Sequence, residues 1–221
     1  MKDVLMIMNA REIPAVLKSI RDLPIDQAWF TGYTEMQLES EIEKFISLTD
    51  YDNYIITSDD LMGNSSALDL VRKQLINFEV ASGYCNLFPG SPLVNLIRSR
   101  IEEGPPHCGD LPQSAQELFM LRKDADNYPN PVFRVYFAGF PLTGMRKKIW
   151  HTHPFRCVHS WPGHASDHMT CLSLQRDDIP IMAVSGAYSE HLGGSTQGFK
   201  HPLIIGIVKP HVTLVKWGQG I

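Results

Sequence analysis

Residues 51–75 read YDNYIITSDDLMGNSSALDLVRKQL, and this stretch decides which fold the sequence favours. The apolar run from Tyr54 to Thr57 is typical of a strand buried on both faces of a parallel sheet. It ends in Ser58-Asp59-Asp60, and residues 68–78 then show apolar side chains at helical spacing. Ligands of open α/β sheets bind beyond the carboxyl ends of the strands. The acidic pair therefore lies where a ligand is expected.

The same strand-then-helix alternation runs through the first 83 residues. The sequence predicts further strands over residues 4–8, 28–31 and 80–83, and helices over residues 13–20 and 38–46. A βαβαβα order implies right-handed crossovers and a mostly parallel sheet.

The remainder of the chain has weaker patterns and more proline and glycine. We expect helices near 92–102, 113–122 and 169–176, strands over 133–138, 179–184, 203–208 and 212–217, and mostly loops over 139–167.

Composition limits the classes of function. The chain has 221 residues, 43% hydrophobic and 20% charged, as in globular proteins with a core. A net charge of −4 gives no general attraction to nucleic acid. No stretch approaches the roughly 20 apolar residues that span a bilayer, and the apolar run near the N-terminus is too short for a signal peptide. The four scattered cysteines suggest reduced thiols, so we expect a cytoplasmic enzyme.

The pair Asp59-Asp60 has two interpretations. Adjacent carboxylates at the end of a buried strand are costly unless they are solvated or paired with a cation. Mg²⁺ or Mn²⁺ bridging the phosphates of a nucleotide would supply that cation, because both ions prefer oxygen ligands. Alternatively, one aspartate caps the helix that begins near Ser66 or the turn at Gly63.

Residues 51–75 resemble the central part of GT-A glycosyltransferases, in which an apolar strand delivers a DxD-like acidic motif. Residues 4–23, VLMIMNAREIPAVLKSIRDL, resemble their first strand and helix. Within the nucleotide-diphospho-sugar transferase superfamily, the inverting enzymes are the most similar. The resemblance implies an α/β GT-A fold, Rossmann-like, with a mostly parallel central sheet flanked by helices. It also implies one domain over residues 1–221, with a nucleotide-binding half (1–83) and an acceptor-side half (84–221).

The resemblance assigns roles to residues of the first half. Asp60 would bind the divalent ion, Mn²⁺ or Mg²⁺, and Asp59 would lie near the ribose or the metal. Ser58 stands where the motif usually has its first aspartate, which leaves the roles of Asp59 and Asp60 open. The residues expected near the nucleotide are Asn9, Ala10, Arg11 and Glu12.

Residues 166–184, SDHMTCLSLQRDDIPIMAV, resemble a later segment of inverting enzymes, where an acid at a helix start is the general base. Asp167 matches that acid, although it would also serve as a helix N-cap. His191 matches a histidine that closes the metal or diphosphate site. Gly139 would permit close approach of the donor sugar, and Trp150 or Trp161 would stack on an acceptor sugar or pack in the core.

The sequence thus predicts a glycosyltransferase that moves a sugar from a nucleotide-diphosphate donor to a hydroxyl of a glycan, protein or lipid head, with inversion. One alternative is a non-catalytic domain that binds a nucleotide sugar or a partner. Another is a sugar-nucleotide pyrophosphorylase, disfavoured because residues 9–12 contain no glycine. The histidine-rich stretch 151–168 could bind zinc, and the basic cluster 146–148 could meet a phosphate.

Overall fold

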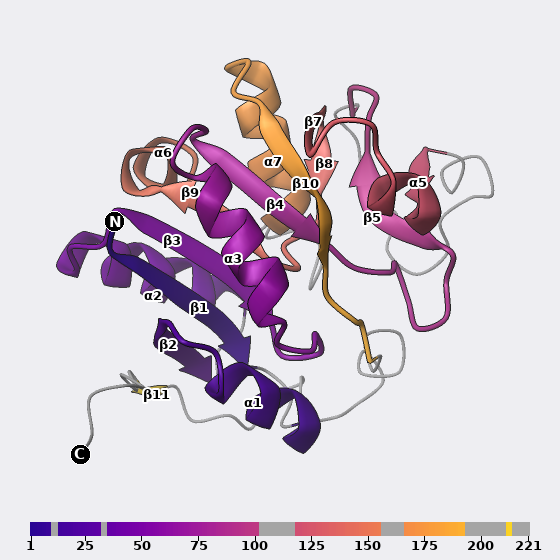
Figure 1. The fold of residues 1–221 in the computed structure, drawn as a ribbon. Helices are drawn as coiled ribbons and strands as arrows, with labels where there is room; N and C mark the ends of the chain where they lie inside the picture. The colour runs from indigo at the N-terminus through magenta and orange to yellow at the C-terminus, as the bar shows by residue number, and fades with distance from the viewer. Residues whose placement is uncertain (10–12, 32–34, 102–117, 156–165, 193–210, 214–221) are drawn as a thin grey trace.

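The computed structural model describes residues 1–221 except 10–12, 32–34, 102–117, 156–165, 193–210 and 214–221. An eight-stranded sheet forms its centre, with helices on both faces (Figure 1). The strands of this sheet, in spatial order, are β11 (His211–Thr213), β2 (Asp26–Thr31), β1 (Asp3–Asn9), β3 (Asn53–Ser58), β9 (Thr143–Arg146), β4 (Val80–Tyr84), β10 (Ile181–Tyr188) and β7 (Val132–Val135).

Five strands of the central sheet run in the same direction: β2, β1, β3, β4 and β10. The other three, β11, β9 and β7, run antiparallel to their neighbours. The predicted α/β fold with a mostly parallel sheet is therefore confirmed.

A second, three-stranded antiparallel sheet lies beside the first. It consists of β6 (Phe119–Leu121), β5 (Leu93–Ile97) and β8 (Phe137–Ala138). The helices are α1 (Pro14–Arg21), α2 (Glu35–Leu48), α3 (Ser65–Gln74), α5 (Arg122–Asp126), α6 (Lys147–Thr152) and α7 (Ser166–Arg176). Within the described residues, no helix has the length and apolar character needed to cross a membrane.

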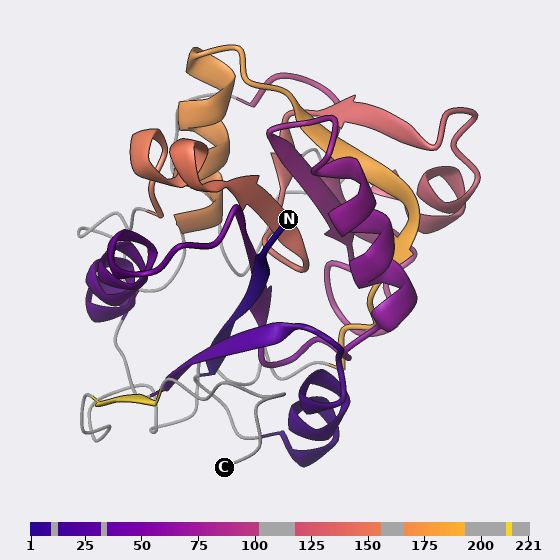
Figure 2. The same ribbon diagram turned by 60° about the vertical axis from the view of Figure 1, so that its left-hand side comes forward.

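The side-chain alternation of the strands divides the core into two layers. Along β1, Val4 and Met6 pack on the face covered by α2, α6 and α7, whereas Leu5 and Ile7 face α1 and α3. Figure 2 shows these two groups of helices on opposite sides of the sheet. Because neighbouring side chains of a strand point to opposite faces, a wholly apolar run is what a doubly covered strand requires. The first half of the chain follows this rule.

Two predictions for the middle of the chain are wrong. Residues 93–97 form strand β5 where a helix over 92–102 was expected, and residues 119–121 of the expected helix 113–122 form strand β6. Strand β5 pairs with β6 on one side and β8 on the other, and pairing on both sides outweighs the helix-like spacing of its apolar residues. Residues 113–117 lie outside the described residues.

The stretch 139–167, predicted to be mostly loop, contains strand β9 and helix α6. Strand β9 enters the central sheet between β3 and β4 and runs antiparallel to both. The predicted halves 1–83 and 84–221 consequently share one sheet. Of the two predicted closing strands, 203–208 and residues 214–217 of the other lie outside the described residues, and β11 includes residues 212 and 213.

Candidate active site at the carboxyl ends of the strands

Asp59 and Asp60 follow the last residue of β3, and both are buried, with 1% and 5% of their surfaces exposed. Helix α3 begins beyond them and is capped by Asn64, whose side-chain oxygen accepts a hydrogen bond from the N–H of Ala67 at 3.2 Å. The Gly63 N–H donates to the Ser19 hydroxyl at 2.8 Å. Asn64 therefore caps α3, and the prediction that an aspartate of the pair caps this helix is wrong.

Residues 60–62 are joined to residues 190–192 by backbone contacts across a sequence separation of about 130 residues. Leu61 and His191 form an antiparallel bridge. The N–H of Met62 donates to the Glu190 carbonyl at 2.9 Å, and the N–H of Leu192 donates to the Asp60 carbonyl at 3.0 Å. This clamp brings the predicted metal ligands together, with Asp60 Oδ2 only 2.9 Å from His191 Nε2.

The orientation of the His191 ring follows from its second contact. Its Nδ1 lies 3.1 Å from the carbonyl oxygen of Asn86. A carbonyl only accepts hydrogen bonds, so Nδ1 carries a proton, and Nε2 is the ring nitrogen that faces Asp60. Metal-binding histidines commonly have this arrangement, with the distal N–H held by a backbone carbonyl. Because His191 Nε2 and Asp60 Oδ2 are 2.9 Å apart, a proton or a cation must lie between these two atoms.

The donor set fits a divalent ion that also binds a substrate. Adjacent ligands on an octahedral ion with bonds of about 2.1 Å are about 3 Å apart, close to the observed Asp60–His191 separation. Among the described residues, no group of three or more histidine, cysteine or acidic side chains surrounds one point. Two protein ligands suffice for Mg²⁺-type sites, in which water and phosphate oxygens complete the coordination.

Asp167 lies in the first turn of α7 and is half-buried. Burial raises the pKa of its carboxyl to about 6, although the hydrogen bond from the His168 N–H lowers it. That N–H donates to Asp167 Oδ1 at 2.7 Å. A carboxylate with a pKa near 6 is ionised at neutral pH and still accepts a proton readily, which suits a general base.

Gly139 lies directly against the Asp167 carboxyl and the side chain of Asn95. A Cβ at position 139 would be 2.9 Å from Asn95 Nδ2 and 3.3 Å from Asp167 Oδ2. Asn95 is buried in β5; its Nδ2 donates to the Gly139 carbonyl at 3.1 Å, and its Oδ1 accepts from the Cys85 N–H at 2.9 Å. Asn95 therefore ties the end of β8 to the end of β4, beside Asp167.

The buried thiol of Cys85 lies close enough to both Asp60 and Asp167 to be affected by their charges. Burial raises the pKa of Cys85 most, and the negative charges of Asp60 and Asp167 raise it further. Both carboxyl groups are thus within electrostatic range of a single buried side chain at the end of β4. The structure brings Asp60, His191, Gly139 and Asp167 to the same edge of the sheet.

The other predicted site residues are placed as follows. Asn9 ends β1, whereas Ala10, Arg11, Glu12 and Trp161 lie outside the described residues. Trp150 is buried, and its Nε1 donates to the Tyr54 carbonyl at 2.9 Å, so it belongs to the core and does not stack on a sugar.

The basic cluster 146–148 serves the structure at the amino end of the sheet. Arg146 donates to the carbonyls of Leu75 and Ile76 just after α3, Lys147 donates to the Thr49 carbonyl, and Lys148 forms an ion pair with Glu79. These contacts leave the cluster away from the acidic edge. In the histidine-rich stretch, the described His153 contacts Asp177 at 3.0 Å, and residues 156–165 lie outside the described residues.

Two asparagines of the site were not predicted from the sequence. Asn86 orients His191 through its backbone carbonyl, and Asn95 positions Gly139. A hydrophobic pattern does not distinguish a buried asparagine from a loop residue. Their only sequence signal is a polar residue immediately after or within an apolar run.

Comparison with known proteins finds similarity in structure alone. No family model and no curated protein matches the sequence. Among solved structures, A197 from STIV is similar at 13% identity with a TM-score of 0.52, over 84% of this chain and 82% of that chain.

Two further structures align with TM-scores below 0.5. CMP:2-keto-3-deoxy-manno-octonic acid synthetase complexed with CTP aligns at 11% identity and a TM-score of 0.49, over 93% of this chain and 98% of that chain. S. aureus TarS 1–349 aligns at 11% identity and a TM-score of 0.45, over 86% of this chain and 60% of that chain.

The sheet order, the helices on both faces and the position of the acidic site together define the class of the protein. It has an α/β fold with a mostly parallel central sheet, similar in structure to A197 from STIV, with a candidate site where the strands of such sheets end. The predicted architecture, a mostly parallel central sheet flanked by helices, is confirmed.

Proposed function

We propose that this protein is a metal-dependent glycosyltransferase that uses a nucleotide-diphosphate sugar. One observation carries the proposal: a carboxylate–imidazole pair, Asp60 with His191, and a carboxyl with a raised pKa, Asp167, lie at the same edge of the sheet. The first suits binding of a diphosphate through a divalent ion, and the second suits removal of a proton. Glycosyl transfer to a hydroxyl needs both functions.

Asp60 and His191 would hold the divalent ion, with Asp59 beside the ribose or the ion. Mn²⁺ or Mg²⁺, when bound, supplies positive charge that stabilises the nucleotide diphosphate as a leaving group. Asn9 at the end of β1 and the three residues that follow it, Ala10, Arg11 and Glu12, would contact the nucleotide. Gly139 would lie beside the donor sugar, next to the Asp167 carboxyl and the Asn95 side chain.

Asp167 would act on the acceptor. Its carboxylate takes the proton of an acceptor hydroxyl as the hydroxyl oxygen bonds to the anomeric carbon and the bond to the diphosphate breaks. Attack on the face opposite the leaving group inverts the anomeric configuration. The acceptor belongs to a glycan, a protein or a lipid head group.

A thermal-shift screen of nucleotide sugars, with and without Mn²⁺, tests the proposal. We expect one donor to raise the melting temperature by several degrees only when Mn²⁺ is present, because ligands that bind the folded state stabilise it. Asp60→Asn should abolish that shift. The matched control is Asp69→Asn, which changes an exposed aspartate on α3 that contacts Arg72 at 3.6 Å.

Product analysis with the donor identified in the screen separates the proposed reaction from its alternatives. Release of nucleoside diphosphate together with sugar transfer or hydrolysis supports the glycosyltransferase. Formation of a nucleoside triphosphate on addition of pyrophosphate would instead show a sugar-nucleotide pyrophosphorylase. Donor binding without turnover, across an acceptor panel, would show a binding domain.

A further inference from the structure

A hollow of about 480 Å³ opens beside the small sheet, between β5 and α5. Its lining residues are Pro92, Leu121, Arg122, Lys123 and Asp126. The proposed reaction uses none of them. The backbone holds the lining together, since the N–H of Arg122 donates to the Pro92 carbonyl at 2.7 Å.

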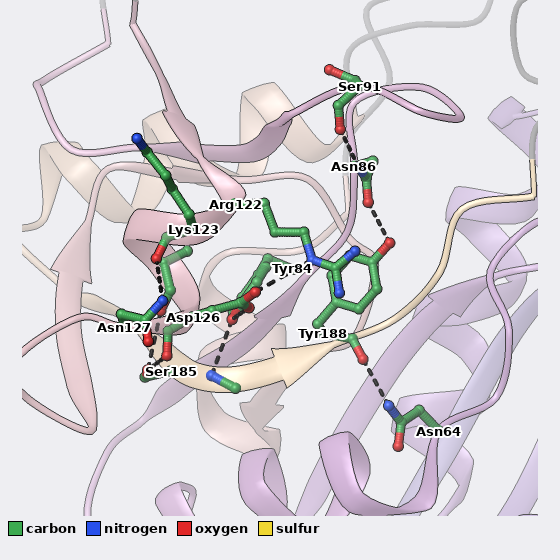
Figure 3. A network of polar contacts seen from close by, with 12 residues as sticks. Asn64, Tyr84, Asn86, Ser91, Arg122, Lys123, Asp126, Asn127, Ser185 and Tyr188 are labelled. Carbon is green, nitrogen blue, oxygen red and sulfur yellow. Dashed lines mark hydrogen bonds and ion pairs between the residues drawn. The ribbon is translucent and has the colours of Figure 1, made fainter.

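Arg122 is held in one orientation by two contacts. Its Nε donates to Asp126 Oδ2 at 3.3 Å, and its guanidinium carbon lies 3.6 Å from the centre of the Tyr188 ring (Figure 3). Asp126 is itself held by the Tyr84 hydroxyl, which donates to Oδ1 at 2.5 Å. Among the described residues, nothing accepts a hydrogen bond from the two terminal nitrogens of Arg122. These nitrogens form a pre-oriented fork of the kind that binds carboxylates and phosphates.

The charges that line the hollow favour an anion of low charge. Arg122 and Lys123 contribute two positive charges, and the Asp126 carboxylate contributes one negative charge. The net lining charge of +1 matches a singly charged oxyanion. A dianion would face the Asp126 carboxylate at close range, which is unfavourable.

A chain of contacts connects the hollow to the candidate active site. Arg122 stacks on the ring of Tyr188. The Tyr188 hydroxyl donates a hydrogen bond to Asn86 Oδ1. The Asn86 backbone carbonyl holds His191, which meets Asp60. The Asn64 side chain also donates to the Tyr188 carbonyl at 2.8 Å, so hydrogen bonds hold both the backbone and the side chain of Tyr188 (Figure 3). The hollow is therefore linked to the proposed donor site through Tyr188 and Asn86.

We infer that this hollow binds a singly charged oxyanion of the acceptor, either the carboxylate of a sugar acid or a phosphodiester. The identification of this ligand as the acceptor rests on the proposed function. The terminal nitrogens of Arg122 would pair with the oxyanion in bidentate fashion, with Lys123 adding a second positive charge. Acceptor recognition would then occur one side chain away from the Asn86–His191 contact.

Titration of the full chain with small probes, followed by NMR of the arginine Nε–H signals and of the Lys123 backbone amide signal, which the Arg122 variants keep, tests this inference. The probes are methyl β-D-glucuronide for the carboxylate and dimethyl phosphate for the phosphodiester, with methyl β-D-glucoside as the neutral analogue. We expect one oxyanion to shift the Arg122 signal and the glucoside to leave it unchanged. Arg122→Gln should weaken binding about tenfold or more, and Arg122→Lys by less, because it keeps the charge and loses the fork.

Arg134→Gln is the matched control. Arg134 is paired with Asp178 at 2.6 Å, is stacked near Tyr136 and is 37% exposed, against 44% for Arg122, but it lies at the other end of β10. The inference is overturned if neither oxyanion shifts the Arg122 signal, if the glucoside shifts it equally, or if Arg134→Gln weakens binding as much. The titration contains no nucleotide sugar, so failure of donor binding in the thermal-shift screen is a separate result.

Discussion

The aspartates at the two edges of the central sheet have different partners. At the amino edge, the Asp3 carboxylate lies 2.7 Å from Nε of Arg72 and accepts a hydrogen bond from Asn53 at 2.8 Å. At the carboxyl edge, Asp60 meets the imidazole of His191, and Asp167 is held by a backbone N–H.

This difference distinguishes an acid that stabilises the fold from the two acids of the proposed active site. Arginine stays charged at physiological pH and stabilises the ionised aspartate beside it. It can neither bind a metal ion nor take up a proton. A neutral imidazole can bind a metal ion through its lone pair, and a carboxyl with a pKa near 6 can exchange a proton near neutral pH. We expect substitutions at the two edges to affect different measurements.

The largest effect expected in this comparison is on turnover at the carboxyl edge. Asp167→Asn should lower kcat/KM by roughly 10²- to 10⁴-fold, because the amide has no basic oxygen of comparable strength. For the wild type, kcat/KM should fall about tenfold per pH unit below pH 6, as Asp167 becomes protonated. The variant should lack this acid limb. An unchanged pH profile in Asp167→Asn would assign the base to another residue.

A smaller loss of turnover is expected from crowding the same edge. Gly139→Ala places a Cβ 2.9 Å from Asn95 Nδ2, and the resulting shift should displace Asp167 and lower kcat about tenfold. Gly90→Ala is the control, because it should destabilise the fold without crowding the side chains around Asp167. Its φ of +76° strains an alanine, yet a Cβ at position 90 meets no atom within 4 Å. Full activity in Gly139→Ala would show that the close packing of Gly139 against Asn95 is not critical to catalysis.

At the amino edge, the expected loss is in stability and not in activity. Arg72→Met leaves the buried Asp3 carboxylate without its cation and should cost about 2 kcal/mol, which lowers the melting temperature by several degrees. Adding Asp3→Asn should recover part of the loss, because the uncompensated charge is then removed. Calorimetry of the single and double variants measures this coupling. Loss of donor binding in Arg72→Met at a temperature where it remains folded would contradict the separation of the edges.

The smallest expected effect is a stability change linked to pH. Burial raises the pKa of Asp167 in the folded protein to about 6, above its value in the unfolded chain. The folded protein therefore holds a proton that the unfolded chain releases, so this contribution is present below about pH 4 and is lost as the pH rises through 6. Asp167→Asn should consequently be more stable relative to the wild type at pH 8 than at pH 4. Denaturant unfolding at pH 4 and pH 8 measures the difference, and an equal difference at both values would refute it.

Several elements could be predicted because their patterns are local. The apolar run of β1, the helical spacing of apolar residues over 13–20 and the apolar run of β3 before Asp59 depend on near neighbours along the chain. Doubly covered strands and amphipathic helices leave clear periodicities. The fold class and the position of the acidic pair at the strand end followed from these patterns.

The arrangement of the site depended on contacts between distant segments. Strand β9 enters between β3 and β4, and β5 forms as a strand because β6 and β8 pair with it. The backbone clamp that brings His191 to Asp60 spans 131 residues of sequence.

The sequence by itself determined the alternating first half of the fold and the residue types available for chemistry. Only the tertiary structure decided that Asn64 caps α3, that Trp150 is buried, and that Asn86 and Asn95 orient the site. The physical reason is that local periodicity reports which face of an element is buried. It does not report which distant backbone group will satisfy a buried polar side chain.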